Sequence, residues 1–368
     1  MKYYLIAGER SGDLHGSNLI KGIKESDPNA DFRGWGGDLM QMEGMELVTH
    51  YQDTAFMGFL EVAMNLHKIS SFLKKCKRDL LEYKPDVVIL IDYPGFNLRI
   101  AEYAKLKGIK TFYYISPKVW AWNQKRALKI KKNVDQMFVI FPFEIDFYKQ
   151  YDYQVDYVGN PLMDAIENFK QDPDFRSKNN LGEQPLIALL PGSRAQEVKS
   201  MLELMLSIRK SFPRYRFVIA AVSNLPKEIY SVFAEDPQVK IVFDATYDLL
   251  KISEAALVTS GTATLETALL NVPEVVCYKT SPFSYRIAKL VIRVKFISLV
   301  NLIMNKEVVR ELIQKELSTG NLISELESIL LGGIKRDIQL AEYEILQQRV
   351  GGAGASRSAG RLMVSYLK

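Results

Sequence analysis

Two short motifs in the second half of the chain combine small residues with hydroxyl groups or a cation, and each stands between an apolar run and a helical pattern. The first is 190–194 (LPGSR) and the second is 260–266 (SGTATLE). A strand–loop–helix turn of this kind directs free backbone N–H groups and a helix N-terminus at a bound anion. Arg194 adds a permanently charged group that suits phosphate oxygens. Together the two turns predict a site for a nucleotide diphosphate.

Short apolar runs alternate with helical patterns along both halves of the chain, as in α/β proteins with parallel sheets. The runs expected as strands are 3–7, 87–91, 111–114, 136–140, 157–158, 186–190, 216–221, 239–243, 256–258 and 275–278. Helices are expected at 198–212, 247–252 and 264–270, and from Glu311 onward until the glycine-rich stretch 351–355. We expect two Rossmann-like domains that face each other across a ligand-binding cleft, followed by a C-terminal helical segment.

The length of 368 residues suits two domains better than one. The polar stretch 168–184 has turn-forming residues and little apolar content, so it is the expected linker. The expected N-terminal domain is 1–167 and the expected C-terminal domain is 185–350. The last helix, 351–368, is expected to cross back to the first domain or to a second chain.

Composition excludes several classes of protein. The net charge of +5 is too small for a dedicated nucleic-acid binder, and it fits an anionic ligand or a membrane surface equally well. The two cysteines and three histidines have no metal-ligand spacing, so we expect no protein-held metal. No uninterrupted apolar stretch is long enough to span a membrane. We therefore expect a soluble or peripheral protein of a reducing compartment.

The first half carries acidic residues after two of its expected strands. The turn 8–13 (GERSGD) lacks the full dinucleotide-binding spacing, and Glu9 and Asp13 in it would repel a pyrophosphate. These acids suit a neutral hydroxylated ligand, although a plain helix-start turn has the same pattern. Asp92 follows the strand expected at 87–91 and is placed to act as general base toward a sugar hydroxyl. The alternative is that Asp92 only caps a turn.

Other segments have a functional and a purely structural interpretation. Trp120 could line a sugar-stacking wall or pack in the core. The stretch 56–77, with Phe56, Met57 and Phe59, indicates either core or a helix on an anionic bilayer. Arg286, Lys289 and Arg293 share one helical face, which suits a phosphate or lipid headgroup or simply solvent. In 260–266, Glu266 could accept ribose hydroxyls, or the motif could be only a capping box.

The acidic pair that would hold a metal beside a pyrophosphate is misplaced. The chain has a single Asp-x-Asp, Asp172–Asp174, and it lies in the expected linker. This placement favours a metal-independent enzyme that uses Arg194 and helix dipoles instead.

Several motifs in order along nearly the whole chain make it similar to a known family. They are found at 7–13, 57–62, 84–86, 91–97, 115–122, 189–194, 260–266 and 297–302, and the runs 116–122 (SPKVWAW) and 260–266 are highly specific. In these features the chain resembles the bacterial lipid-A-disaccharide synthase family, glycosyltransferases with the GT-B fold.

The resemblance implies an inverting hexosyltransferase that depends on a UDP-sugar and uses no cofactor. The implied reaction moves 2,3-diacylglucosamine from UDP to the 6-hydroxyl of 2,3-diacylglucosamine 1-phosphate. Its products are UDP and the β-1,6-linked lipid A disaccharide 1-phosphate. The implied setting is the cytoplasm of a Gram-negative bacterium, in peripheral association with the inner-membrane surface. No nucleic-acid partner is implied, and a homodimer is left open.

The resemblance also implies roles for individual residues. Asp92 is the implied general base, with Glu9 left open for that role or for orienting a sugar, and Asn301 is an implied essential residue near the cleft. The expected ligands of the UDP-sugar are Gly192, Ser193, Arg194, Ser260, Gly261, Thr262, Ala263, Thr264 and Glu266. The residues expected to face the acceptor or the lipid are Ser11, Asp13, Phe56, Met57, Phe59, Trp120, Arg286, Lys289 and Arg293.

Two other functions remain open from the sequence. A UDP-N-acetylglucosamine 2-epimerase has the same fold, and it would need no lipid-facing segment. A non-catalytic protein that binds UDP-sugar or lipid would keep Arg194 and 260–266 but would tolerate the loss of Asp92.

Overall fold

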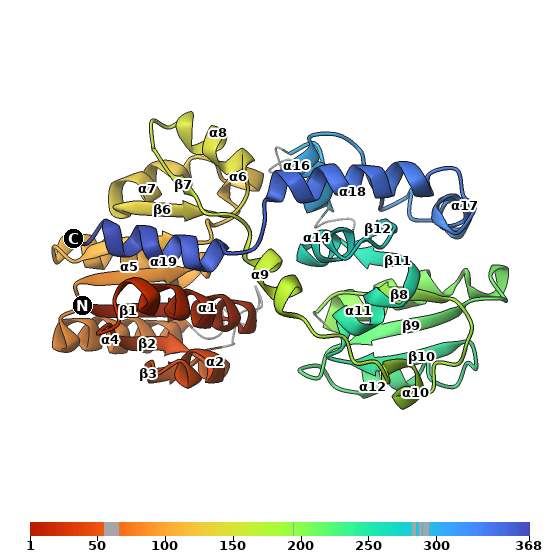
Figure 1. Cartoon of the computed structure of the whole chain (residues 1–368), viewed down its shortest axis with the longest axis horizontal. Helices are drawn as coiled ribbons and strands as arrows, with labels where there is room; N and C mark the ends of the chain where they lie inside the picture. The colour runs from red at the N-terminus through yellow and green to blue at the C-terminus, as the bar shows by residue number, and fades with distance from the viewer. Residues whose placement is uncertain (55–65, 194, 282–284, 287–288, 290–293) are drawn as a thin grey trace. The chain divides into compact units, whose positions relative to one another are not determined.

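The computed structural model describes residues 1–54, 66–193, 195–281, 285–286, 289 and 294–368, and its backbone divides into two compact units. Unit 1 comprises Met1–Asp164 and Gly351–Lys368, and unit 2 comprises Ala165–Val350. The chain therefore enters unit 2 after Asp164 and returns to unit 1 after Val350. Figure 1 shows both chain ends in unit 1.

Unit 1 is built on a parallel sheet, whose described strands have the order β3-β2-β1-β4-β5-β6-β7. The strands are β1 (Lys2–Ala7), β2 (Asp31–Gly36), β3 (Glu46–His50), β4 (Val87–Ile91), β5 (Lys110–Tyr114), β6 (Gln136–Val139) and β7 (Asp156–Tyr157). All five residues of β4 are buried, as expected for a strand with helices on both faces.

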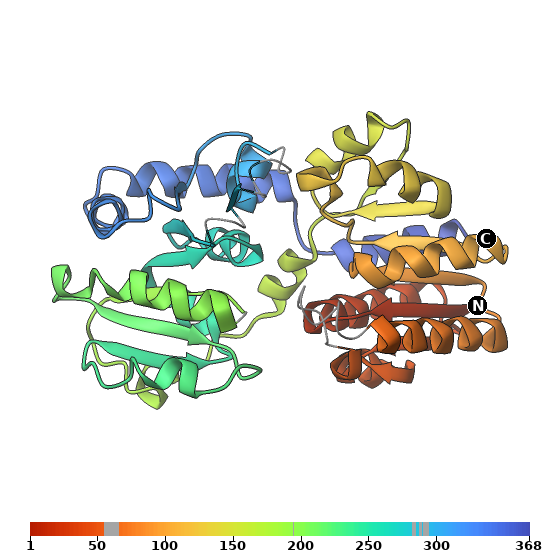
Figure 2. The same cartoon turned by 180° about the vertical axis from the view of Figure 1, so that it is seen from behind.

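Helices cover both faces of this sheet. Figure 1 shows α1 (Arg10–Ser26) and α19 (Ala355–Ser365) over one face, and Figure 2 shows α4 (Leu66–Tyr83) and α5 (Pro94–Leu106) over the other. The remaining described helices of the N-terminal part are α2 (Asp38–Met42), η1 (Tyr51–Thr54), α6 (Val119–Trp122), α7 (Arg126–Asn133), α8 (Phe143–Lys149) and α9 (Pro161–Asn168).

Strands β2 and β3 were not expected from the sequence. The segment DFRGWG of β2 has two glycines and two charged residues among six, so it lacks the continuous apolar run of a central strand. The fold requires a glycine at position 34, because a Cβ there would lie 2.9 Å from the backbone N of Leu5. The glycine lets β2 approach β1 closely. The residue type at position 34 is therefore set by a backbone contact and not by the burial of a side chain.

Unit 2 has a second parallel sheet, with the order β10-β9-β8-β11-β12-β13 in its described residues. Its strands are β8 (Leu186–Leu190), β9 (Arg216–Ala221), β10 (Val239–Phe243), β11 (Ser253–Thr259), β12 (Glu274–Tyr278) and β13 (Arg310–Ile313). Alternate residues of β8 enter two separate cores, with Ile187 and Leu189 in one and Leu186, Ala188 and Leu190 in the other. The sheet is thus buried on both faces.

The described helices of unit 2 connect these strands. They are α10 (Phe175–Lys178), α11 (Ala195–Leu206), η2 (Arg209–Ser211), α12 (Glu228–Ser231), α13 (Thr246–Lys251), α14 (Thr262–Leu269), α16 (Leu299–Met304), α17 (Thr319–Ile329) and α18 (Arg336–Val350). The expectation of continuous helix from Glu311 was wrong, because Arg310–Ile313 forms the edge strand β13 beside β12. Its Leu312 is buried. Of the two charged residues before it, Glu311 accepts the N–H of Ser298 and Arg310 forms an ion pair with Glu316.

The polar stretch expected as a linker contributes to unit 2. Residues 168–184 all belong to that unit, and Phe175 and Leu181 are 4% and 0% exposed in its core. The change of unit lies earlier, at Asp164. Phe175 and Leu181 are thus buried apolar residues within a mostly polar stretch.

The last helix, α19, packs on α1 of unit 1 in the same chain. Gly22 and Gly360 allow the close approach, since a Cβ on Gly360 would lie 2.5 Å from the carbonyl carbon of Gly22. Asp164 fixes the start of the helix by accepting hydrogen bonds from the backbone N–H groups of Ala355 (3.2 Å), Ser356 (3.0 Å) and Gly354. The carboxylate thus satisfies donors that a helix start leaves unpaired.

Candidate functional site

Each unit has one point where the strand order reverses, and the candidate residues gather there. In unit 1 the chain runs from β1 outward to β3 and then starts again at β4, so the reversal lies between β1 and β4. In unit 2 it lies between β8 and β11. Ligands of open α/β sheets bind outside the carboxyl ends of the strands at such points. Glu9 and Asp92 follow the first pair of strands, and Gly192 and Ser260 follow the second.

Asp92 and Tyr93 adopt left-handed backbone conformations with φ of 43° and 52°. Such conformations are strained for residues with a side chain, and they concentrate at functional sites. Hydrogen bonds hold the turn, because Asp92 N donates to the Tyr114 carbonyl (3.1 Å) and Asn97 Nδ2 donates to the Asp92 carbonyl (2.8 Å). The hydroxyl of Tyr113 donates to the same carbonyl. The sequence thus fixes a carboxyl group at the end of a central strand.

The surroundings of the Asp92 carboxyl make it a stronger base than an ordinary aspartate. Burial raises its pKa most, the charge of Lys118 lowers it, the charge of Glu9 raises it, and the N–H of Tyr93 lowers it, with a net value of about 6. Such a group is mostly ionised at neutral pH and still accepts a proton readily. A perturbed carboxyl at a strand end is typical of a catalytic site.

Glu9 lies at the adjacent strand end. It precedes α1 in an extended conformation, it is exposed, and Ala7 of β1 pairs with Ile91 of β4. Ser11, in the first turn of α1, is also exposed. The structure therefore brings Glu9 and Asp92 together and leaves Ser11 accessible beside them.

Asp13 has a different role from the expected contact with the acceptor. It is 3% exposed, and its carboxylate accepts the backbone N–H groups of Gly37 (2.8 Å), Met40 (3.0 Å) and Leu39 (3.1 Å). These donors belong to the start of α2, so Asp13 is a helix cap supplied from α1.

Trp120 also lies inside unit 1 and not on an exposed wall. It is 5% exposed, and its Nε1 donates to Oε1 of Glu144 (3.1 Å). Glu144 accepts the N–H groups of Ile140 and Phe141 as well, and burial raises its pKa to about 7. The contact anchors the loop that carries Lys118, which is exposed and whose charge acts on Asp92.

In unit 2 the motif 260–266 forms the turn from β11 into α14. The helix begins after Gly261, which caps it without any side-chain hydrogen bond, so the capping-box interpretation was wrong. Ser260 Oγ donates to the Ile297 carbonyl (2.9 Å), and Thr264 Oγ1 donates to the Gly261 carbonyl (2.9 Å). Thr262 is exposed at the helix start, and Gly261 and Ala263 are half-buried.

Glu266 lies one turn into α14 and is partly buried. The hydroxyl of Tyr247 donates to its Oε1 (2.9 Å). Burial raises the pKa of Glu266, and the hydrogen bond from Tyr247 opposes this shift. A carboxylate held in one orientation by a tyrosine is suited to accept hydroxyl hydrogen bonds from a ligand.

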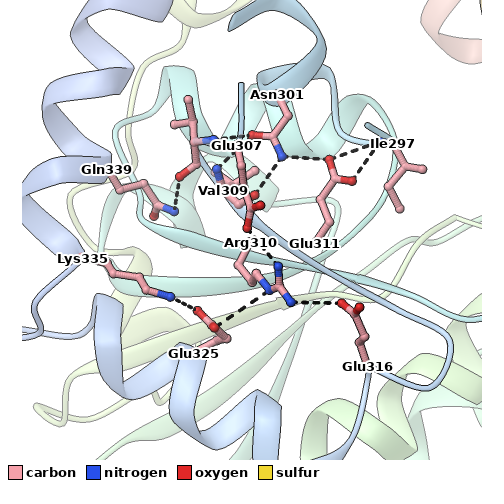
Figure 3. A network of polar contacts seen from close by, with 11 residues as sticks. Ile297, Asn301, Glu307, Val309, Arg310, Glu311, Glu316, Glu325, Lys335 and Gln339 are labelled. Atoms are coloured by element: carbon pink, nitrogen blue, oxygen red, sulfur yellow. Dashed lines mark hydrogen bonds and ion pairs between the residues drawn. The ribbon is translucent and has the colours of Figure 1, made fainter. Parts of the chain in front are cut away.

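Asn301 is buried and fully engaged within the protein. Its Nδ2 donates to the Val309 carbonyl (2.8 Å) and to Oε1 of Glu311 (2.9 Å), and its Oδ1 accepts the N–H groups of Val308 (2.7 Å) and Val309 (3.0 Å). Figure 3 shows the amide within this network. Both donors and both acceptor positions of the amide are used, so Asn301 positions backbone and does not contact a reacting atom.

The other expected residues divide into exposed ones and ones that are not described. Gly192 has a φ of 106° in the turn after β8, and Ser193 is exposed beside it. Arg286 and Lys289 are exposed. The expected residues that lie outside the described ones are Phe56, Met57, Phe59, Arg194 and Arg293.

Sequence analysis missed several residues that shape these two regions. Lys118 was part of a quoted motif, and its charge beside an isolated strand-end acid was the signal that could have identified it. Tyr247 and Glu311 gave no signal, because each meets its partner only through the fold. Within the described ranges, no group of three or more histidine, cysteine, aspartate or glutamate residues could hold a metal ion. No described helix is both long and apolar enough to cross a membrane.

Comparison with known proteins agrees with this geometry. A family model described as "Lipid-A-disaccharide synthetase" matches residues 3–358. The lipid-A-disaccharide synthase of Trichlorobacter lovleyi is 36% identical over 371 residues, covering 99% of this chain and 97% of the relative. That of Syntrophus aciditrophicus is 38% identical over 372 residues, with the same coverage of 99% and 97%.

Solved structures share the fold at low identity. The UDP-GlcNAc 2-epimerase of Neisseria meningitidis, bound to UDP-GlcNAc, has a TM-score of 0.70 and 15% identity, with 100% of this chain and 99% of the other covered. The glycosyltransferase of kitacinnamycin has a TM-score of 0.68 and 12% identity, with the same coverage of 100% and 99%. These likenesses establish the architecture alone.

Two parallel, doubly wound units with polar residues at both strand reversals define an α/β protein of the GT-B type, as expected. The relatives specify it further. The chain belongs to the lipid-A-disaccharide synthetase family, UDP-sugar-dependent glycosyltransferases of lipid A disaccharide synthesis. This confirms the resemblance drawn from the motifs. The epimerase alternative is not favoured, because the epimerases share the fold at 15% identity or less, whereas the synthases match at more than twice that.

Proposed function

We propose that this chain transfers 2,3-diacylglucosamine from UDP to the 6-hydroxyl of 2,3-diacylglucosamine 1-phosphate. The products are UDP and the β-1,6-linked disaccharide 1-phosphate, and the configuration at the donor C1 is inverted. The family membership supports the class of reaction. The observation that supports the chemistry is the carboxyl of Asp92, which a strained backbone holds at the end of β4 and whose pKa of about 6 suits a general base.

The proposed reaction is a single displacement. Asp92 takes the proton of the acceptor 6-hydroxyl as its oxygen forms a bond to C1 of the donor sugar. The bond between C1 and the β-phosphate oxygen breaks, and its electron pair leaves with UDP. Burial is the main cause of the raised pKa of Asp92, and the charge of Glu9 adds to it. Glu9 also follows the adjacent strand, where we propose that it orients a sugar hydroxyl.

The proposed site of the nucleotide is unit 2. The exposed Thr262 at the start of α14, the turn at Gly192, and the fixed carboxylate of Glu266 offer donors and acceptors for phosphate and ribose. Solved structures of this fold contain UDP-GlcNAc or UDP, among them the epimerases of Neisseria meningitidis and Methanocaldococcus jannaschii. Arg194 stays the predicted partner of the diphosphate.

We further propose that the protein acts at the inner-membrane surface as a peripheral, cytoplasmic enzyme. Both proposed substrates carry acyl chains, which must reach the active site from a bilayer. The exposed cations Arg286 and Lys289 suit anionic headgroups, and the apolar residues of 56–59 stay the predicted lipid-facing segment.

The reaction is tested by incubating the purified protein with both lipid substrates in detergent, with and without EDTA. Mass spectrometry is expected to detect a tetraacyl disaccharide 1-phosphate and free UDP in both samples. A parallel sample contains UDP-N-acetylglucosamine, and conversion of this donor in place of the lipid donor would support an epimerase. Binding of UDP without any turnover would support a non-catalytic protein.

A further inference from the structure

Glu311 of β13 holds the segment that leads into α16. Its carboxylate accepts the backbone N–H groups of Ile297 (3.0 Å to Oε2) and Ser298 (2.9 Å to Oε1), and it also accepts Nδ2 of Asn301 (2.9 Å). Figure 3 shows the carboxylate directed at Ile297 and at Asn301. Hydrogen bonds to an ionised carboxylate are stronger than neutral ones, so these three donors have one preferred arrangement.

The segment held by Glu311 contacts the proposed nucleotide motif directly. The Ile297 carbonyl accepts the hydroxyl of Ser260 (2.9 Å), and the Leu299 N–H donates to Oγ1 of Thr264 (3.3 Å). Glu311 is therefore linked to the turn that precedes α14 through the intervening segment 297–299. Its strand, β13, is separated from β11 by β12, so the link runs through the loop and not through neighbouring strands.

The segment has little freedom to compensate for a loss of Glu311. Ser298 Oγ accepts the backbone N–H of Asn301 (3.2 Å), and the amide of Asn301 is used entirely by Glu311, Val308 and Val309. Ser298 and Asn301 are both 0% exposed, so water cannot readily replace a missing partner. Without the carboxylate, the N–H groups of Ile297 and Ser298 would lose their acceptor.

We propose that Glu311 is a positioning residue for UDP binding, which acts by fixing 297–299 and through them the hydroxyls of Ser260 and Thr264. Asn301 belongs to the same hydrogen-bond network, and its proposed role is also to position this segment. The inference rests on the proposed function, because it takes 260–266 as the nucleotide motif. It assigns no contact between Glu311 and the substrate.

The test is the affinity of UDP for wild type and for Glu311→Gln, measured by calorimetry. Glutamine keeps the size of the side chain and one acceptor oxygen, but it loses the charge and places an NH₂ group against the other donors. We expect UDP to bind about tenfold more weakly, and the KM of the UDP-sugar to rise with little change in kcat. Glu316→Gln is the matched control, because Glu316 is exposed and pairs with Arg310 (3.1 Å), and it is expected to bind UDP like wild type.

A second measurement requires no variant. Hydrogen exchange of the wild-type amides at 260–264 and at 297–299 is compared with and without UDP, and both segments are expected to exchange more slowly in its presence. Equal UDP affinity in folded Glu311→Gln, or slowing at 260–264 alone, would overturn the positioning role while leaving the nucleotide site intact. Absence of UDP binding by wild type would instead remove the proposed nucleotide site, and the inference with it.

Discussion

The ring of Tyr93 covers Gly8 so closely that a Cβ on Gly8 would lie 2.5 Å from ring carbons Cδ1 and Cδ2. Tyr93 is 7% exposed and has a left-handed backbone, as does its neighbour Asp92. The glycine after β1 therefore makes room for the turn that presents the carboxyl after β4. The two strand ends form one structural unit, although 85 positions separate Gly8 from Tyr93 in the numbering of the chain.

Gly8→Ala is expected to lower turnover on the order of a hundredfold, because a displacement of about 1 Å in a catalytic group has effects of that size. The new methyl group displaces Tyr93 and with it Asp92. UDP affinity, a property of unit 2, is expected to stay unchanged. Steady-state kinetics and calorimetry measure the two quantities. Gly320→Ala is the control, because a Cβ at Gly320 meets nothing within 4 Å, and wild-type turnover in Gly8→Ala would refute the coupling.

The pH dependence of kcat/KM is expected to show an acidic limb near pH 6. The base must be ionised to act, and with a pKa of about 6 it is about one-tenth ionised at pH 5 and about nine-tenths at pH 7. Activity therefore rises with pH through this range. A limb near pH 4, the ordinary position of an aspartate, would show that burial does not set the pKa.

Two neighbouring charges are expected to move this limb in opposite directions. The charge of Glu9 raises the pKa of Asp92, so Glu9→Gln shifts the limb to lower pH. The charge of Lys118 lowers that pKa, so Lys118→Met shifts the limb to higher pH. Both pH profiles of kcat/KM are measured beside the wild type. Shifts of the same sign would exclude an electrostatic origin.

Gly360→Ala is expected to destabilise unit 1 by about 1–3 kcal/mol, the usual cost of overpacking. Its Cβ would lie 2.5 Å from the carbonyl carbon of Gly22 and 2.6 Å from the N of Ile23, and backbone atoms cannot rotate away. Urea denaturation measures the change, with Gly320→Ala as a control in open space. An unchanged unfolding midpoint would mean that α19 is not held against α1.

The continuous apolar strands were predictable from the sequence, and the irregular ones were not. Strands β4 and β8 have the expected bounds, because all five residues of each are apolar and buried. Strands β9 and β10 also have the expected bounds, although each contains one charged residue. Strand β2 escaped because Gly34 serves a backbone contact, and β13 escaped because its charged residues resemble a helix surface. The hydrophobic pattern of a segment indicates which of its side chains are buried. The formation of β2 and β13 depends instead on the strands beside them in the sheet.

The same distinction applies to the candidate site. Asp92 and the motif 260–266 could be identified because polar residues directly follow apolar strands. The roles of Asp13 and Asn301 could not, because their partners are known only once α2 and β13 are in place. A polar residue in a motif can therefore be a helix cap or a support for the backbone, and its hydrogen bonds distinguish these roles from contact with substrate.

In the proposed reaction, Asp92 of unit 1 takes the proton and unit 2 binds the nucleotide. The most direct measurement is the turnover of Asp92→Asn, with UDP affinity determined on the same sample. The matched control is Asp86→Asn, at the opposite end of β4, where the exposed carboxylate accepts only the N–H of Lys2 among the contacts described (2.7 Å). We predict a loss of about 10²–10⁴-fold in turnover with unchanged UDP affinity, and wild-type behaviour of the control. Near-normal turnover of Asp92→Asn would contradict the account.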